Sequence, residues 1–367
     1  MSTLHTQLCD LLGIQYPIIQ APMAGGMTTP ELVAAVCEAG ALGSFAASRL
    51  TSDQVLNAIG KIKSLTDKPF AVNFLVAPPE QAEADVAETQ EFLDQFRQRL
   101  GIPSGDPNFT LRPSNLDEQI QMVLDEGVPI LSTALGDPSP YIERAHAKGT
   151  KIIAMATTVD EAIHCEQVGC DAVVAQGAEA GGHRSTFQLG PNYEGQLIGG
   201  MALTPQVADA VNIAVVATGG IGDGRGLIAA LALGASGVQI GTRFLLAREA
   251  ATIAAYRERL LNAKENDTVI TRSTSGRPTR SIRNQLIDAY RESGVEPLPF
   301  PLQGQVIADV FTAALARGAA DYFPLQAGQG LRLLKDKQSA SEIINEIIGD
   351  ARAIISRWCE INSDERR

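Results

Sequence analysis

Several residue types are scarce in this sequence, and each scarcity excludes a class of protein. The 367 residues include four histidines, one tryptophan and five cysteines, with no C-x-x-C pair. An odd number of cysteines at such spacings indicates neither a disulfide framework nor a zinc site, and we expect a reducing, cytoplasmic location and no bound metal. Lysine and arginine (30) are outnumbered by aspartate and glutamate (42), so the net charge is -12. We expect no nucleic-acid or anionic-membrane partner, because phosphate binding requires clustered basic side chains.

Long hydrophobic runs are also missing. The stretch MSTLHTQLCDLLG has no basic region followed by an apolar run, and GLIAALALGASGVQIG is interrupted by glycines. These features predict neither export nor a membrane anchor. The hydrophobic (45%) and charged (20%) fractions are those of a folded globular protein, for which a small molecule is the expected partner.

Short apolar runs, each followed by a helix-like stretch, recur along the first 245 residues. This alternation predicts repeated βα units with a buried parallel sheet, and eight units predict a closed (β/α)8 TIM barrel. The expected strands are 17–21, 41–47, 69–76, 128–134, 151–157, 171–176, 213–218 and 237–242. Two helices have clear boundaries: Thr28 or Thr29 with Pro30 opens one before Gly40, and TTVDEAIHCEQVG repeats that design.

Two additions interrupt the barrel pattern. Residues 78–116 contain an acidic amphipathic helix expected to overhang the strand-end face, and residues 246–335 read as helical throughout. We therefore predict a barrel formed by 1–245 with 336–367, and a small helical domain, 246–335, over its mouth. The last helix should dock against the barrel, with Trp358 and Cys359 in the core.

Active sites of such barrels form at the carboxyl ends of the strands, where this chain has glycine-rich segments. TGGIGDG and QIGTRF follow strands seven and eight, so Gly219, Gly220, Gly241 and Thr242 could hold a phosphate. Alternatively, the glycines only make tight turns. A dinucleotide fingerprint is rejected, because GGIGDG lacks the acidic residue about twenty positions later.

Three polar residues stand at or beyond strand ends. Asn73 and Gln176 are costly to bury unless satisfied, either by a bound polar ring or by a neighbouring strand. His183, in AQGAEAGGHRSTF, follows strand six on a long loop, where it is either a general base or a solvated loop residue.

Other polar residues are weaker candidates. His146 and His164 fall on barrel helices, His5 is near the terminus, and Glu179 and Arg184 could pair with each other or with the loop. The basic run TRSTSGRPTRSIRN could meet an anionic ligand or balance nearby acidic residues.

The segments PIIQAPMAGGM, VNFLV, DAVVAQGAEAGGHR, VATGGIGDGRG, VQIGTRFL, SGRPTR and PLQAGQG, in this order, resemble nitronate monooxygenase. The resemblance runs from about residue 8 to 335 and implies an FMN enzyme of nitronate detoxification. Such an enzyme oxidises alkyl nitronates, propionate 3-nitronate among the candidates, or nitroalkanes with O2 to carbonyl compounds and nitrite. A homo-oligomer is compatible with it.

Carried onto this sequence, the resemblance assigns the catalytic role to His183, which takes the α-proton of a neutral nitroalkane. It places the flavin ring and ribityl chain beside Pro22, Met23, Asn73, Gln176 and Gly181. The phosphate falls to Gly219, Gly220, Gln239, Gly241 and Thr242. The substrate side is expected in 78–116 and 295–305.

Two alternatives remain open on sequence grounds. An NAD(P)H-dependent FMN reductase, acting on quinones or enoyl thioesters, shares the GGH loop and the phosphate glycines. A non-catalytic flavin-binding protein would leave His183 unused.

Overall fold

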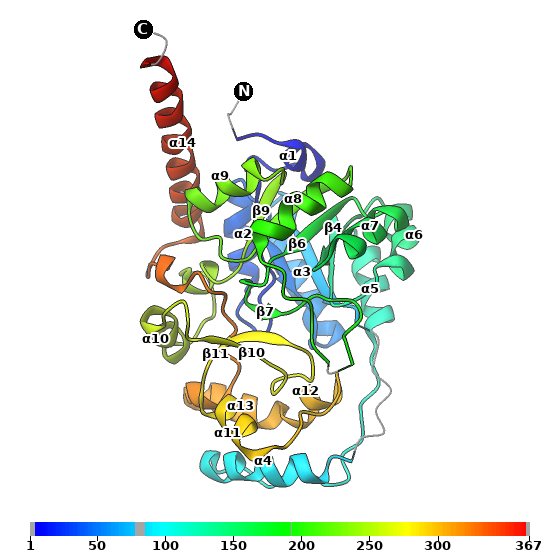
Figure 1. Cartoon of the computed structure of the whole chain (residues 1–367). Coiled ribbons are helices and arrows are strands. Elements are labelled where there is room, and N and C mark those ends of the chain that lie inside the picture. Colours follow the sequence, from blue (N-terminus) through cyan, green and yellow to red (C-terminus); the bar gives the residue numbers. More distant parts are fainter. Residues whose placement is uncertain (1–3, 78–84, 192, 365–367) are drawn as a thin grey trace.

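Eight parallel strands form the barrel at the centre of the computed structural model, which describes residues 4–77, 85–191 and 193–364 (Figure 1). Their order is β1-β9-β8-β6-β5-β4-β3-β2. A parallel bridge between Ile19 and Leu42 closes the ring from β2 to β1. The strands are β1 (Ile18–Gln20), β2 (Ser44–Ala46), β3 (Ala71–Leu75), β4 (Ile130–Ala134), β5 (Lys151–Ala156), β6 (Ala172–Gln176), β8 (Ala214–Thr218) and β9 (Gly237–Ile240). All lie within the predicted ranges, and the predicted TIM barrel is confirmed.

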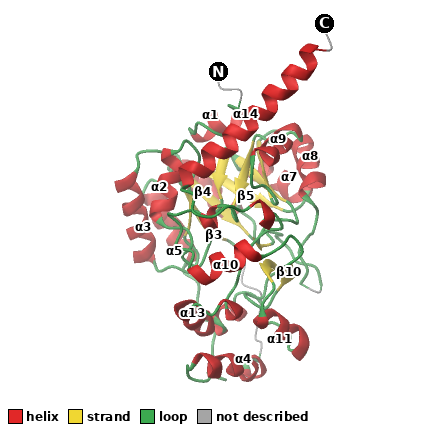
Figure 2. Cartoon of the chain, turned by 90° about the vertical axis from the view of Figure 1, so that its left-hand side faces the viewer, coloured by secondary structure: helices red, strands yellow, loops and turns green. Residues whose placement is uncertain are grey.

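Helices alternate with these strands and cover the outside of the barrel (Figure 2). They are α2 (Pro30–Glu38), α3 (Ser52–Leu65), α5 (Leu116–Asp125), α6 (Ser139–Ala147), α7 (Val159–Val168), α8 (Gly200–Ala210), α9 (Gly224–Ala232) and α14 (Ala340–Asp364). The predicted caps are present: the Thr29 hydroxyl accepts the Leu32 N–H at 2.9 Å, and the Thr158 hydroxyl accepts the Glu161 N–H at 3.1 Å. Each cap satisfies a helix donor that would otherwise lack a partner.

The amino end of the barrel is filled by the short helix α1 (Gln7–Leu12). Leu8 and Leu12 belong to one buried cluster with strand residues such as Ile130, Ile153 and Val174. Because this end is packed, a ligand can enter only at the opposite, carboxyl end of the strands.

A second body, here called the cap, covers that carboxyl end and lies below the barrel in Figure 1. Its elements are α10 (Ala254–Asn262), β10 (Thr268–Thr271), β11 (Thr279–Ile282), α11 (Gln285–Ser293), α12 (Leu302–Val306), α13 (Ala308–Arg317) and the 3-10 turns Ala320–Tyr322 and Leu331–Leu333; a further turn, Phe244–Leu246, follows β9. The expectation of helix throughout 246–335 is wrong, because β10 and β11 form an antiparallel hairpin. The β-branched run TVIT of β10 favours this extended conformation.

Helix α4 (Ala87–Leu100), from the 78–116 insertion, packs against the cap at the side farthest from the barrel (Figures 1 and 2). Arg97 Nε lies 2.8 Å from Asp309 Oδ2, and its Nη2 donates to the Val306 carbonyl at 3.1 Å. The predicted helix exists, but it does not overhang the strand ends. Residues 78–84 of this insertion lie outside the described part. A separate domain 246–335 beside a barrel of 1–245 and 336–367 remains a proposal, and α4 would join it.

The last helix, α14, docks on the barrel through Ile343, Ile344 and Ile347, as predicted. The expectation that Trp358 and Cys359 are core residues is wrong: Trp358 is 53% exposed and Cys359 is also exposed. The physical reason is length, since the helix continues past the edge of the barrel (Figures 1 and 2). No helix within the described ranges is both long and apolar enough to cross a bilayer.

Candidate active site

A cavity of about 570 Å³ lies at the carboxyl ends of the barrel strands. Its size is within the usual range for small-molecule sites. All the residues that the resemblance assigns to catalysis or flavin binding line it: Pro22, Met23, Asn73, Gln176, Gly181, His183, Gly219, Gly220, Gln239, Gly241 and Thr242. The geometry therefore brings these residues together, while their individual roles remain proposals.

The loop after β8 requires glycine. Gly219 and Gly220 have φ angles of 117° and 69°, in the left-handed region. A Cβ on Gly219 would also lie 3.0 Å from the Ala180 nitrogen. The backbone conformation of these glycines is thus explained by the tight turn that they form. Whether they also contact a bound phosphate is a separate question, which belongs to the proposed function.

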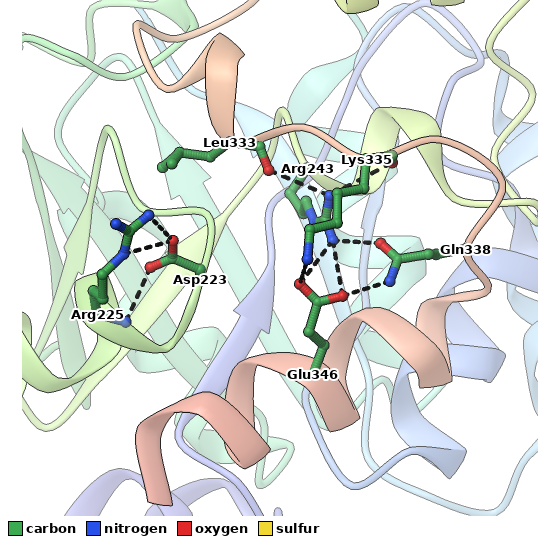
Figure 3. Close-up of polar contacts among 7 residues, drawn as sticks. All are labelled: Asp223, Arg225, Arg243, Leu333, Lys335, Gln338 and Glu346. Atoms are coloured by element: carbon green, nitrogen blue, oxygen red, sulfur yellow. Dashed lines mark hydrogen bonds and ion pairs between the residues drawn. The ribbon is translucent and has the colours of Figure 1, made fainter. Parts of the chain in front are cut away.

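Arg243, three residues after β9, is a cation within QIGTRF that is not among the predicted phosphate-binding residues. Its side chain is almost fully buried and is held by the Leu333 carbonyl at 3.4 Å and by Gln338 and Glu346 (Figure 3). Its Nε is buried, and no hydrogen-bond partner for it exists in the described chain. Because Arg243 also lines the cavity, this donor is available to an anion there.

Asn73 and Gln176 both make internal hydrogen bonds. Asn73 Nδ2 donates to the hydroxyl and carbonyl oxygens of Ser132 on β4, at 3.0 and 3.2 Å. Gln176 Nε2 donates to the His183 carbonyl at 2.9 Å, and its Oε1 accepts the Ser185 N–H at 2.8 Å. The internal explanation therefore holds for both amides, and Gln176 fixes the backbone on either side of Arg184.

His183 lies in a strand, β7 (Gly182–His183), and not in a free loop. It pairs with Thr279 of β11, so the cap hairpin and β7 form one three-stranded sheet. The imidazole lines the cavity, and its Nε2 lies 2.8 Å from Ser275 Oγ. The backbone of His183 is thus held by both the barrel and the cap.

The Ser275 hydroxyl can donate to the Arg277 carbonyl at 3.4 Å and accepts the Arg277 N–H at the same distance. In its contact with His183 Nε2, either atom can be the donor. In the tautomer that carries the proton on Nε2, Nδ1 is the basic nitrogen. Burial, with the charges of Arg49 and Arg277, lowers the pKa of His183 to about 3. The ring is consequently neutral near pH 7 and has a free nitrogen lone pair, while the lowered pKa makes it a weaker base than a free imidazole.

Two arginines of the basic run donate to backbone carbonyls. Arg277 donates to the carbonyls of Leu135, Thr186 and Phe187, and Arg280 donates to that of Ala178 at 2.9 Å. Arg272 and Arg283 pair with acidic neighbours, Glu296 and Asp288. The run therefore joins the cap to the barrel.

Glu179 and Arg184 interact with their own loop. Both carboxylate oxygens of Glu179 accept the Gly200 N–H, at 3.0 and 2.9 Å, at the start of α8. Arg184 donates to the carbonyls of Gln176 and Gly177, each at 2.8 Å. These contacts shape the chain around β7.

The remaining wall of the cavity comes from α13, with Ala308, Phe311, Thr312 and Leu315. Neither 85–116 nor 295–305 lines it, so the expectation for the substrate side is wrong for these residues, and its remaining part, 78–84, lies outside the described residues. Sequence reasoning also missed Arg49 and Ser275. Arg49 could have been found, because it follows strand two at the strand-end face, whereas Ser275 required knowledge of the hairpin.

The other histidines lie elsewhere: His5, His146 and His164 are paired with Asp10, Asp171 and Asp137, and none lines the cavity. Over the ranges that the structure covers, no three His, Cys, Asp or Glu side chains are grouped to hold a metal ion.

Comparisons with known proteins agree with this geometry. The family model described as nitronate monooxygenase matches residues 5–350. A probable nitronate monooxygenase from Staphylococcus saprophyticus is 39% identical over 96% of this chain and 99% of its own.

Two solved structures are similar over nearly the whole chain. Nitroalkane oxidase from Streptomyces ansochromogenes has a TM-score of 0.87 and 34% identity, covering 96% of this chain and 99% of its own. FabK from Thermotoga maritima has a TM-score of 0.78 and 29% identity, covering 98% and 100%. This chain therefore belongs to the nitronate monooxygenase family and is an oxidoreductase.

Proposed function

We propose that this protein is an FMN-dependent nitronate monooxygenase that oxidises alkyl nitronates, and neutral nitroalkanes after proton removal, with O2 to carbonyl compounds and nitrite. One observation carries the proposal: a neutral, anchored imidazole and two glycine-rich strand-end loops line the same cavity. Family membership supports nitronate oxidation in general.

The cavity residues fit an FMN phosphate at one end. Arg243 Nε is a buried donor without a partner, and Gly219 and Gly220 keep side chains away from the approach to the backbone. The Thr242 hydroxyl accepts the Gly328 N–H at 3.0 Å, so its own hydrogen remains free to donate. We assign the phosphate to these residues with Gln239 and Gly241, and the ring side to Pro22, Met23, Asn73, Gln176 and Gly181.

Bound FMN would supply the electron acceptor and the reaction with O2. The protein's residues would supply the rest. His183 Nδ1 would accept the α-proton of a neutral nitroalkane, and Ser275 would hold the ring in orientation through Nε2. The apolar wall of α13 would exclude water from the reacting carbon.

The test is oxygen uptake by the FMN-loaded protein given ethyl nitronate or propionate 3-nitronate, without NADH and with nitrite measured. Uptake with nitrite release is the expected result. Rapid anaerobic bleaching of the flavin by NADH without nitronate turnover would instead establish a reductase, the alternative favoured by the similarity to FabK. Protein that cannot be reconstituted with FMN would point to a non-catalytic role.

The phosphate assignment predicts a change of ligand preference in Arg243→Met. We expect FMN to bind about tenfold more weakly or worse, since a charge-assisted hydrogen bond contributes about 1.5–3 kcal/mol, while riboflavin, which has no phosphate, is little affected. Fluorescence titration with each flavin measures the ratio.

Arg248→Met is the matched control, because Arg248 also pairs with α14, through Glu342 at 2.7 Å, but does not line the cavity. Equal losses of FMN and riboflavin affinity in Arg243→Met would show that Arg243 only supports the fold.

A further inference from the structure

Arg49 stands in a strained and tightly held turn after β2. Its φ angle is 72°, in the left-handed region, which is unfavourable for a non-glycine residue. Neighbouring groups fix this turn: the Ser48 hydroxyl accepts the Leu75 N–H, and the Leu50 carbonyl accepts from Gln119 Nε2, both at 2.8 Å. Backbone strain that is held in this way is found mostly at functional sites.

The guanidinium of Arg49 lies close to the candidate base. A Cβ placed on Gly304 would come within 2.8 Å of Arg49 Nη2 and 3.7 Å of the Ser275 Cα. Arg49 therefore occupies the space that a side chain at 304 would take, beside the serine that orients His183. Its charge also contributes, after burial, to the lowered pKa of His183.

Within the described chain, no hydrogen bond or ion pair engages the Arg49 head group. Burial alone lowers its pKa, with no acidic neighbour acting in the opposite direction. Arg49 is exposed and lines the cavity. A ligand that fills the cavity would take water away from this cation, and a cation without water or a counter-ion is unfavourable unless an anion joins it.

The cavity itself selects for negative charge. Its described lining includes no aspartate or glutamate, although the whole chain has a net charge of -12. The two charged residues in that lining are Arg243, which is paired with Glu346, and Arg49, which is not. With the Arg243 Nε assigned to the FMN phosphate, a second anion would find its cationic partner at Arg49, close to His183.

We propose that Arg49 is a catalytic residue that binds the two oxygens of the substrate's nitro or nitronate group. This inference rests on the proposed function. A nitronate resembles a carboxylate in shape and charge, and a guanidinium binds such a pair of oxygens with two parallel hydrogen bonds. In a neutral nitroalkane the α C–H bond breaks, the proton goes to His183, and the electron pair moves onto the nitro oxygens, where Arg49 stabilises the charge.

Three variants test the proposal, with propionate as an inert probe that matches ethyl nitronate in its heavy-atom skeleton. In the FMN-loaded protein, Arg49→Met should raise the Kd for propionate and the KM for ethyl nitronate about tenfold or more, with Arg49→Lys intermediate. Gly304→Ala should raise both while keeping the charge, because its methyl group displaces the guanidinium. The exposed Arg291, replaced by Met, is the charge-loss control and should change neither.

A second measurement separates binding from support of the fold. The described charged groups that act on His183 are Arg49 and Arg277, and Ser275 is its neutral neighbour. Arg49→Met should therefore raise the pKa of His183 toward its ordinary value, as followed by NMR of the imidazole. The four histidines make this assignment practicable.

The outcomes distinguish this inference from the proposed function. If the unmodified protein oxidises ethyl nitronate but Arg49→Met and Gly304→Ala leave Kd, KM and the His183 pKa unchanged, the role of Arg49 is overturned and the function stands. If nitronate is not oxidised but propionate binding still depends on Arg49, the function fails and the anion site remains.

Discussion

His183→Asn should lose activity on neutral nitroethane by about 10²–10⁴-fold, the usual contribution of a general base, while losing less than about tenfold on ethyl nitronate. The reason is that the nitronate arrives without the α-proton that His183 would remove. Steady-state kcat/KM on both substrates, at matched FMN content, measures the difference.

His164→Asn is the matched control, because His164 lies outside the cavity and pairs with Asp137 at 2.9 Å. Equal losses on the two substrates in His183→Asn would refute the base assignment.

The low pKa of His183 adds a pH criterion. Since only the deprotonated ring can act, and its pKa is about 3, kcat/KM for nitroethane should show no His183 titration between about pH 5 and 8. A fall in kcat/KM for nitroethane centred near pH 6.5 would contradict the lowered pKa of His183.

Arg277→Met should lower the free energy of unfolding by about 3 kcal/mol or more, because it leaves buried carbonyls without a donor, each at a cost of about 1–3 kcal/mol. The Arg277 guanidinium donates to Thr186 at 2.8 Å and to Leu135 and Phe187 at 3.2 Å, and only 2% of the residue is exposed. Urea unfolding of the FMN-free protein, followed by circular dichroism, provides the measurement.

Arg283→Met serves as the comparison for Arg277→Met. Arg283 follows the same hairpin, but its side chain is 53% exposed and pairs with Asp288. Exposed ion pairs contribute about 1 kcal/mol or less. A loss in Arg277→Met no greater than that in Arg283→Met would mean that water replaces the missing donors, and that this arginine does not join cap and barrel.

The barrel and much of the site could be predicted because their signals are local. Each strand is a short apolar run with helix caps such as Thr29 and Thr158 nearby. The strand-end rule then places Asn73, Gln176 and Gly219 at one end without any knowledge of tertiary contacts.

The cap contacts could not be predicted, because they depend on residues far apart in the sequence. Nothing local to Arg277 reveals that its partners lie after β4 and β7, and the pairing of β7 with β11 has no signal in either segment alone. The apolar periodicity of the last helix predicts that Trp358 is a core residue. That periodicity shows which face of a helix is apolar, but not how far along the helix the barrel extends. The strained turn at Arg49 also depends on two other segments, through Leu75 and Gln119.

The strand β7 has a consequence for when the enzyme becomes complete during synthesis. His183 is made before β8 and β9, but its partner Thr279 follows both of them. Pairing between distant segments forms slowly compared with local contacts. During synthesis, most of the barrel can therefore form before the hairpin that pairs with His183 exists. The side of the cavity that contains His183 is completed only after the barrel that supports it.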